Sequence, residues 1–391
     1  MKKLTMDALE MTGRRVFVRV DFNVPLKDGI VQEDTRIRAT LPTLKQALDK
    51  GAKLVLGSHL GRPKGRRRPE LSLAPVAERL SEHLGKPVGF CGETVGDTVD
   101  REVGKLANGE MLLLENLRFY PGETDNDADF ARRLSTTAEL YVNDAFGTAH
   151  RAHASTNGMV RHFKQAAAGV LMEKELHYLD MALTDPPHPF TAMLGGAKVS
   201  DKIEVVRSLL EKVDRLLIGG GMAYTFLRAR GLPTGKSLVE EDKVELAKNL
   251  LEEAGEKLVL PLDHIVASKF DAEAEHRVMP ISEIPDGWMG LDIGPETVAA
   301  YGDQIRAAKM ILWNGPMGVF EMEPFAKGTV ALAEVIAASD GTSVVGGGDS
   351  VAAVHQAGVA DRITHISTGG GASLEFLAGE KLPGVEVLTD A

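Results

Sequence analysis

Short apolar runs alternate with longer stretches of helical periodicity along the whole chain. This alternation limits the possible fold classes more than any other feature of the sequence. In the first half, the apolar runs occupy residues 16–20, 53–58, 111–115 and 139–144. In the second half, they occupy residues 190–194, 214–220, 264–268, 309–315, 343–348 and 365–368. Nearly continuous apolar strands that alternate with helices are typical of parallel sheets covered on both faces.

The stretches between these strands have the periodicity of amphipathic helices. Helices are predicted at residues 38–50, 74–84, 127–135, 199–212, 240–254, 295–307, 328–339 and 349–357. Each half of the chain has the size of one domain. The sequence therefore predicts an α/β fold with two Rossmann-like domains, each a parallel sheet covered by helices.

A helical pattern at residues 169–183 leads into the proline-rich segment 184–189. Adjacent prolines end a helix and stiffen the connection that follows. We therefore expect a first domain over 1–170, a hinge helix and linker over 171–188, and a second domain over 189–372. Periodicity alone does not distinguish a hinge helix from an ordinary helix inside one domain.

The net charge of −11 argues against a nucleic-acid partner, which needs a basic face. Residues 1–170 hold 26 Lys and Arg against 22 Asp and Glu, whereas residues 171–391 hold 19 against 34. The first half could attract a small anion. The second half is acidic overall, so it would need local hydrogen-bond donors or positive charges to hold a phosphate. Such asymmetry is also common on solvated surfaces.

No apolar run reaches the roughly 18 residues of a membrane-spanning helix, so no membrane partner is expected. The N-terminus has no apolar core before Asp7, which argues against a signal peptide. The single cysteine, Cys91, cannot form an internal disulfide, and this is typical of a reducing cytosol. We therefore expect a cytoplasmic protein.

Polar and basic side chains follow four predicted strands of the first half, where ligands of open α/β sheets bind. Arginine donates paired hydrogen bonds to a phosphate or carboxylate, histidine adds a donor, and Asp or Asn can hold a hydroxyl group. A single residue of this kind is usually solvated or caps a helix. The whole group of such residues predicts that the ligand is a small, hydroxylated anion. They are Asp21, Asn23, Arg36, His59, Arg62, Arg118 and Arg151. Arg66, Arg67 and Arg68 are predicted to face solvent instead.

Glycine-rich loops follow the strands of the second half, at residues 195–196, 219–221, 315–318, 346–348 and 369–371. Glycine lets backbone N–H groups approach a phosphate, although such loops often serve only close helix packing. Lys198 and Lys202 are four residues apart at the start of a predicted helix, so both can face the same phosphates. Asp349 offers a carboxylate suited to Mg²⁺ carried by a nucleotide.

Two other motifs are incomplete. Residues 231–237, GLPTGKS, resemble a P-loop, but the spacing is one residue short and the segment follows a helical pattern. We predict a surface loop there. No glycine cluster fits the dinucleotide fingerprint, which weakens the alternative of an NAD-dependent two-domain dehydrogenase.

Long motifs spread over the chain resemble the phosphoglycerate kinase family. They are RVDFNVP (19–25), SHLGRP (58–63), ENLRF (115–119), NDAFGTAHRAHAS (143–155), LGGAKVSDKI (194–203), IGGGMAYTF (218–226), WMGLDIGP (288–295), WNGPMGVFE (313–321), GGGDSVAA (346–353) and STGGGASLEFL (367–377). They occur in order, with no block missing, which argues against coincidence.

The resemblance implies a phosphotransferase with a carboxyl group as acceptor. The reaction would be reversible transfer of the acyl phosphate of 1,3-bisphosphoglycerate to MgADP, giving 3-phosphoglycerate and MgATP in glycolysis and gluconeogenesis. The resemblance further implies a monomer with small-molecule partners, two domains joined by a helical hinge, and a C-terminal tail, from about Ser373, that packs on the first domain.

Family matching also assigns the sites. It places 3-phosphoglycerate on Asp21, Asn23, Arg36, His59, Arg62, Arg118 and Arg151. It places the nucleotide on Lys198, Lys202, Gly219, Gly220, Gly290, Asn314, Glu321, Gly347, Gly348, Asp349 and Ser350. Asp349 would hold the Mg²⁺, and Glu321 would meet the ribose.

Phosphoryl transfer depends on in-line positioning and charge stabilisation. We expect Arg36 and Lys198 to neutralise the transferring group from opposite domains, and the turn ending at Gly371 to direct amides toward it. Closure of the hinge would then precede the chemistry. A noncatalytic sugar-phosphate-binding protein is a further alternative, against which the presence of Lys198, Asp349 and Arg36 counts.

Overall fold

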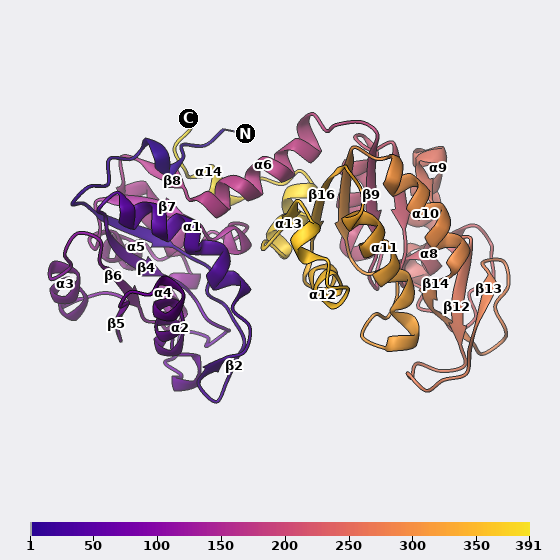
Figure 1. Cartoon of the computed structure of the whole chain (residues 1–391), viewed down its shortest axis with the longest axis horizontal. Coiled ribbons are helices and arrows are strands. Elements are labelled where there is room, and N and C mark those ends of the chain that lie inside the picture. The colour runs from indigo at the N-terminus through magenta and orange to yellow at the C-terminus, as the bar shows by residue number, and fades with distance from the viewer. Residues whose placement is uncertain (1) are drawn as a thin grey trace. The chain divides into compact units, whose positions relative to one another are not determined.

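The computed structural model describes residues 2–391, and the chain divides into two compact units (Figure 1). The first comprises the chain up to His177 together with Lys381–Ala391, and the second comprises Tyr178–Glu380. Helix α6 (Val170–Thr184) begins in the first unit and ends in the second. Among the described residues, no helix is long and apolar enough to cross a membrane.

The first unit contains a six-stranded parallel sheet with the strand order β5-β6-β4-β1-β7-β8. Its strands are β1 (Arg15–Arg19), β4 (Lys53–Gly57), β5 (Gly89–Cys91), β6 (Met111–Leu114), β7 (Leu140–Asn143) and β8 (Ala166–Ala168). A small hairpin pairs β2 (Leu26–Lys27) with β3 (Ile30–Val31). The helices are α1 (Thr35–Asp49), α2 (Ala74–Leu84), α3 (Asp97–Gly104), α4 (Pro121–Thr124), α5 (Ala128–Ser135) and α14 (Pro383–Glu386).

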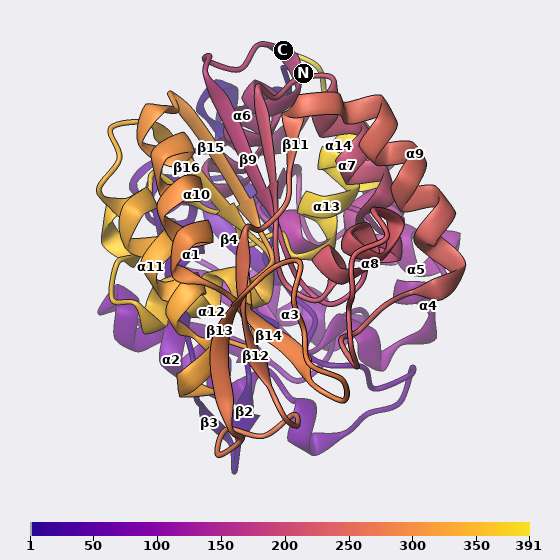
Figure 2. The same cartoon turned by 90° about the vertical axis from the view of Figure 1, so that its right-hand side faces the viewer.

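The second unit contains another six-stranded parallel sheet, with the order β11-β10-β9-β15-β16-β17. Its strands are β9 (Phe190–Leu194), β10 (Arg215–Ile218), β11 (Leu258–Val259), β15 (Met310–Asn314), β16 (Thr342–Gly346) and β17 (His365–Ile366). The helices are α7 (Ile203–Leu210), α8 (Met222–Ala229), α9 (Val244–Ala254), α10 (Pro295–Ala307), α11 (Lys327–Ala337), α12 (Gly348–Gln356) and α13 (Gly371–Leu377). Helices α10 and α11 lie on one side of this sheet, and α8 and α9 lie on the other (Figure 2). The two covered parallel sheets confirm the predicted fold class.

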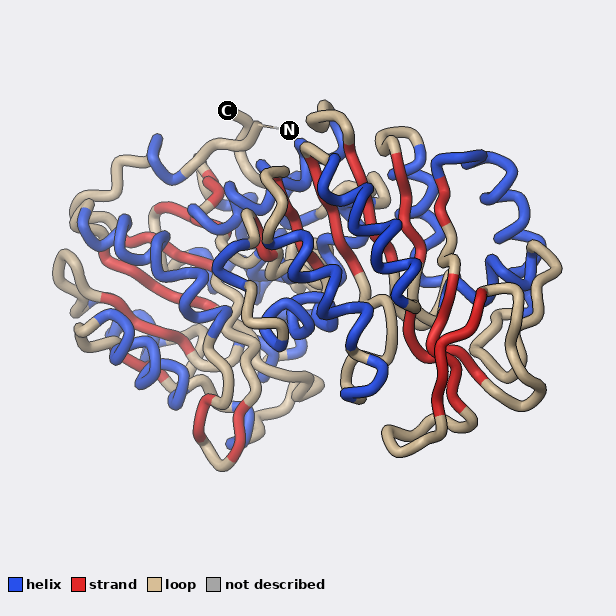
Figure 3. The backbone as a smooth tube through the Cα atoms, turned by 45° about the vertical axis from the view of Figure 1, so that its right-hand side comes forward, coloured by secondary structure: helices blue, strands red, loops and turns tan. Residues whose placement is uncertain are grey.

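One predicted strand belongs to a different sheet. The run at 264–268 is β12 (Asp263–Ala267), the centre of a three-stranded antiparallel sheet with β13 (His276–Pro280) and β14 (Met289–Ile293), and Figure 3 shows this sheet apart from the main one. The expectation of a parallel strand was wrong here because β12 is as buried as the strands of the main sheet. Its partner β13 is mostly exposed and therefore gives no apolar signal.

The chain ends in the unit where it starts. Backbone hydrogen bonds join Leu4 to Thr389 and Thr389 to Ala166, and the side chain of Asn143 donates to the carbonyl oxygen of Gly384 at 3.0 Å. The segment that returns to the first unit starts at Lys381, later than the expected start near Ser373, because α13 packs against α7 of the second unit.

A change of strand order marks the candidate ligand sites. In the first unit, β1 lies between β4, the next long strand along the chain, and β7, a much later one. In the second unit, β9 lies between β10 and β15 in the same way. Such switch points open a crevice beyond the carboxyl ends of the strands.

Candidate functional site

In the first unit, the residues that follow β1 form a connected polar group. The Nη1 atom of Arg36, in the first turn of α1, donates to Oδ2 of Asp21 at 2.6 Å. The other carboxylate oxygen, Oδ1, accepts from the backbone N–H of Asn23 at 3.1 Å. The Asn23 side chain in turn accepts from the N–H of Gly61 at 2.8 Å, which joins this loop to the one after β4. Arg36 keeps about a third of its side chain exposed (33%), so its remaining donors can reach a ligand.

His59 lies buried beneath this group. Its Nδ1 atom is 3.4 Å from Nη2 of Arg19 and 3.9 Å from Oδ1 of Asp21. Burial, followed by the charges of Arg19, Arg118 and other nearby arginines, lowers the pKa of His59 well below its ordinary value. The ring is therefore neutral at pH 7. Because a guanidinium group only donates, Nδ1 accepts from Arg19 and Nε2 carries the proton.

Arg118, after β6, has donors that no protein group satisfies. Its Nη1 atom donates to the carbonyl oxygen of Gly61 at 2.9 Å, whereas Nε and Nη2 are buried and have no partner. Burial, Arg19 and Arg151 lower the pKa of Arg118 to about 10, so the guanidinium stays charged at pH 7. The Nδ1 atom of His150 is likewise buried without a partner. Buried polar atoms of this kind are costly unless a ligand or water satisfies them, and an anion fits these donors.

The remaining arginines of the predicted group differ in their surroundings. Arg151 is half-buried, and its Nε atom lies 3.1 Å from Nε2 of His150. Arg62 is exposed and follows Gly61 in the loop. Arg67 and Arg68 are exposed and pair with neighbouring glutamates, as predicted for that loop.

Sequence reasoning missed Arg19, which is fully buried in β1. Its Nε atom donates to Oγ of Ser155 at 2.7 Å, and its Nη2 atom is 3.9 Å from Oε1 of the buried Glu123. Ser155 also donates to Glu123 through Oγ at 2.5 Å and through its backbone N–H at 2.9 Å. A single arginine inside an otherwise apolar strand was the signal that could have revealed this charged layer under His59.

In the second unit, a cleft of about 720 Å³ opens at the switch point between β9 and β15. The glycine-rich loops form its floor and are tied together by backbone hydrogen bonds. Gly196 donates to Pro316 at 3.0 Å, and Gly220 donates to Met317 at 2.9 Å. Gly315 has a φ of 95°, and a side chain there would collide with the backbone of Gly195. Glycine is therefore required where these loops meet.

Four of the predicted nucleotide residues line this cleft: Gly220, Gly290, Glu321 and Asp349. A second set of the predicted nucleotide residues lies at the ends of β15 and β16. The Nζ atom of Lys202 donates to the side chain of Asn314 and, at 3.3 Å, to its carbonyl oxygen. The Oγ atom of Ser350 accepts from the N–H of Gly315 at 2.5 Å. Burial lowers the pKa of Lys202 to about 8, against the opposing effect of Asp201 and Asp349.

The other predicted residues lie around these two sets. Gly219 donates to the carbonyl oxygen of Leu194 at 2.9 Å, and Gly347, with a φ of 91°, leads into Gly348 at the start of α12. Lys198 is exposed and is not among the residues that line the cleft. Gly371 is exposed at the first turn of α13.

The apolar wall of the cleft was not predicted. It consists of Tyr224, Leu238, Phe270, Met289, Leu291, Val319 and Met322. Apolar side chains look alike in a single sequence, so only their position in the fold identifies them. Residues 231–237 form a loop, as predicted, but Lys236 of that loop reaches the cleft.

Across residues 2–391, no group of three or more His, Cys, Asp or Glu side chains is placed to hold a metal ion. One carboxylate, that of Asp349, fits a metal that arrives with a ligand supplying most of its coordination, as nucleotide-bound Mg²⁺ does.

Guanidinium donors at the switch point of one α/β unit and glycine-rich loops at that of another both suit phosphate-bearing ligands. The fold and the two sites therefore indicate a two-domain α/β protein that binds small phosphate-bearing molecules.

Comparison with known proteins identifies the family. The model of the family described as "Phosphoglycerate kinase" matches residues 6–380. The chain belongs to the phosphoglycerate kinase family and is a phosphotransferase. This membership rules out the dehydrogenase alternative.

Relatives match over essentially their whole length. The chain is 58% identical to phosphoglycerate kinase of Moorella thermoacetica, and the match covers 100% of both chains. It is also 58% identical to phosphoglycerate kinase of Solibacter usitatus, where the match covers 99% of this chain and 100% of the relative. The solved phosphoglycerate kinase structure from Coxiella burnetii is 42% identical with a TM-score of 0.90, and the one from Pyrococcus horikoshii is 36% identical with a TM-score of 0.87. Each comparison covers 98% of both chains.

Proposed function

We propose that this chain transfers the acyl phosphate of 1,3-bisphosphoglycerate to MgADP, giving 3-phosphoglycerate and MgATP, and catalyses the reverse reaction as well. In the transfer, the bond between phosphorus and the acyl oxygen breaks, the carboxylate leaves, and a β-phosphate oxygen of ADP bonds to phosphorus. The glycolytic and gluconeogenic role, the cytoplasmic location and the monomeric state expected from the sequence are part of this proposal. The observation that carries it is the set of buried, unsatisfied donors on Arg118 and His150.

The 3-phosphoglycerate site is proposed on Asp21, Asn23, Arg36, His59, Arg62, Arg118 and Arg151. The free donors of Arg118 suit a phosphate or carboxylate, since each can give a charge-assisted hydrogen bond. Neutral His59, with its proton on Nε2, can donate without adding charge. Asp21 fixes Arg36 in place, which leaves the other guanidinium donors free for the substrate.

The nucleotide site is proposed on the cleft and on the group around Lys202. Glu321 would meet the ribose, and the apolar wall suits an adenine ring. Asp349 would hold the Mg²⁺ that the nucleotide carries, and this ion would supply positive charge at the phosphates. Lys202, Asn314, Gly347, Gly348 and Ser350 would hold the phosphates at the ends of β15 and β16, together with Gly219 after β10.

For the transfer itself, we propose that Arg36 and Lys198 neutralise the moving phosphoryl group and that the turn at Gly371 directs amides toward it. Because the two substrates bind to different units, the units must close before transfer, and closure also excludes water. Helix α6, which passes from one unit into the other, is the proposed hinge.

A coupled assay tests this function directly. Purified protein is mixed with 1,3-bisphosphoglycerate, ADP and Mg²⁺, and ATP formation is followed. We expect turnover that requires all three components and that vanishes in the Arg118→Ala variant. A wild-type protein that binds 3-phosphoglycerate but forms no ATP would contradict the proposal and favour the noncatalytic binding protein.

A further inference from the structure

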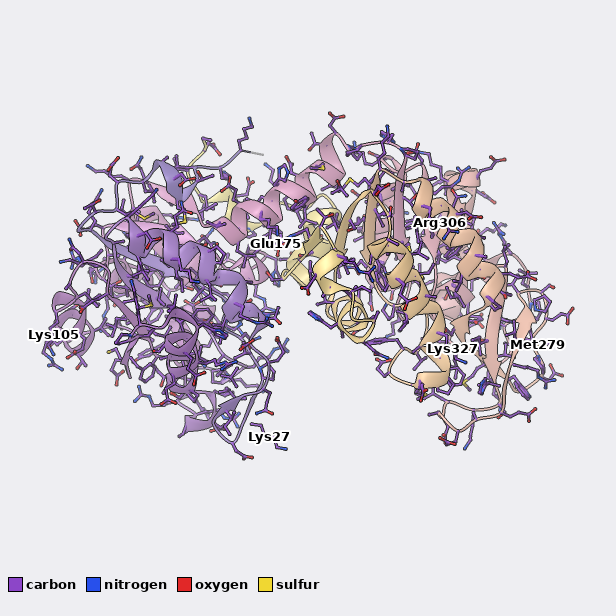
Figure 4. All side chains as sticks on the ribbon, in the orientation of Figure 1. Lys27, Lys105, Glu175, Met279, Arg306 and Lys327 are labelled. Atoms are coloured by element: carbon purple, nitrogen blue, oxygen red, sulfur yellow. The ribbon has the colours of Figure 1, made fainter. Side chains whose placement is uncertain are left out.

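A second cavity, of about 520 Å³, lies in the second unit between the three-stranded sheet and helices α10 and α11. Its apolar lining comes from all three strands and from α10, through Ile265, Val278, Ile293 and Val298. None of its residues lines the nucleotide cleft or belongs to the predicted sites. Figure 4 labels Lys327 at the start of α11 and Met279, the neighbour of Val278 on β13. The volume is that of a site for a small organic molecule.

The ionisable side chains in the lining are all of basic types. They are His276, Arg277 and Lys327, and no Asp or Glu lines the cavity. This is unusual in a half of the chain that holds 34 acidic and 19 basic residues besides histidine. Glu296 and Glu323 are close to the cavity along the chain, but both are exposed and lie outside the lining.

The two permanently charged residues of this lining, Arg277 and Lys327, have no carboxylate partner in the part of the chain that the structure describes. Within residues 2–391, neither Arg277 nor Lys327 forms an ion pair with an acidic side chain, whereas Lys269 pairs with Asp271 at 2.9 Å and Arg306 pairs with Asp303 at 2.6 Å. The Arg277 guanidinium instead lies over the Trp288 ring, 4.2 Å from its centroid. This contact orients the side chain but leaves its charge available to an anion.

Two buried aspartates near the cavity, Asp263 and Asp292, already accept hydrogen bonds from the backbone. Asp263 accepts from the backbone N–H groups of Glu296 and Thr297 at the start of α10. Asp292 accepts from the N–H of Gly328 at the start of α11 at 2.8 Å. Backbone N–H groups at both helix starts therefore engage these two carboxylates, and within residues 2–391 neither Asp263 nor Asp292 forms an ion pair with a basic side chain.

We propose that this cavity binds a small amphipathic anion, an organic molecule with an apolar body and one anionic head group. The apolar body fills the space between Ile265, Ile293 and Val298, and the head group meets Lys327 and Arg277. The site lies behind the nucleotide cleft. Phe325 packs in one cluster with Ile265, which lines the cavity, and with Leu291, which lines the cleft.

The fluorescent anion 8-anilinonaphthalene-1-sulfonate is the probe for this site, with saturating MgADP present to block the nucleotide cleft. We expect saturable binding to one site per chain. Lys327→Glu should weaken this binding at least tenfold by reversing a charge at the head group. Ala331→Trp should do the same by filling the cavity, since Ala331 lines it. Lys309→Glu, an exposed lysine of the same unit outside the lining, should change the binding less than twofold.

The uncharged analogue N-phenyl-1-naphthylamine separates charge from apolar contact. It should bind the wild type at least tenfold more weakly than the sulfonate and should be insensitive to Lys327→Glu. Equal binding of the two probes would overturn the proposal, as would sulfonate binding that survives both substitutions or disappears with MgADP. ATP formation by the Lys327→Glu and Ala331→Trp variants should equal that of the wild type, which shows that they fold and separates this test from that of the proposed reaction.

Discussion

The guanidinium of Arg19 lies 3.9 Å from the carboxylate of Glu123, and both side chains are fully buried in the first unit. Glu123 also accepts two hydrogen bonds from Ser155, so it anchors the segment after β7 to the charged layer beneath His59. A buried cation without its counter-charge is strongly destabilising.

We therefore expect Glu123→Ala to lower the free energy of unfolding by about 3–5 kcal/mol. Chemical denaturation followed by circular dichroism measures the loss. The matched control is Glu82→Ala, whose partner Arg79 is at the surface, and which should leave the unfolding midpoint nearly unchanged. Equal stability of the two variants would show that the buried pair contributes nothing.

Arg36 belongs to the polar group after β1, keeps a third of its side chain exposed (33%) and is held in place by its ion pair with Asp21. Arg36→Ala should lower kcat by about 10²–10³, the usual effect of losing one group that stabilises transition-state charge. The affinity for ADP should stay within about twofold, because Arg36 belongs to the other unit. Steady-state kinetics and nucleotide titration check both parts. Near-normal turnover would remove Arg36 from the proposed mechanism.

Asp349 is the carboxylate of the cleft proposed to hold the nucleotide's metal. Asp349→Asn keeps the size of the side chain but removes its charge, so MgADP should bind at least tenfold more weakly. Metal-free ADP should lose little affinity. Calorimetric titrations with Mg²⁺ and with a chelator give the two values. If both forms weaken equally, Asp349 acts on the nucleotide itself and not through the metal.

We expect the proposed nucleotide residue Lys202 to make the affinity for ADP depend on pH. Its pKa is lowered to about 8, so below pH 8 the ammonium is charged and can bind a phosphate, and above pH 8 it loses the proton. A bound phosphate favours the charged form, so the affinity for ADP should fall as pH rises through 8, by up to about tenfold per pH unit. Titrations between pH 6.5 and 9.5 measure this fall. Lys202→Arg stays charged over this range and should bind with a flat profile; a fall of the same size in the variant would assign the effect to another group.

Much of the fold could be predicted from the sequence because local signals agree with it. The helix predicted at 74–84 is α2, which ends where Gly85 adopts a left-handed φ of 62°. The helix predicted at 295–307 is α10, which starts with Pro295 at a position that suits proline. The three-stranded sheet could not be predicted, because β13 has almost no buried face and so gives no apolar signal beside β12.

The residues of the candidate site also fall into those that the sequence reveals and those that it does not. Charged and polar residues after strands, such as Asp21, His59 and Arg118, were evident from residue type and position. Arg19 was hidden inside an apolar strand, and the apolar wall around Tyr224 has no distinctive residue type. Gly290 and Glu321 were expected only from the family resemblance, and both line the cleft.

The hydrogen bonds that join Leu4 to Thr389 and Asn143 to Gly384 have a consequence for synthesis on the ribosome. The second unit, Tyr178–Glu380, is complete in the growing polypeptide before the last segment of the first unit has been translated. The second unit can therefore begin to fold while the first still lacks α14 and the contacts around Thr389. The first unit is thus the first whose translation begins and the last whose translation is completed.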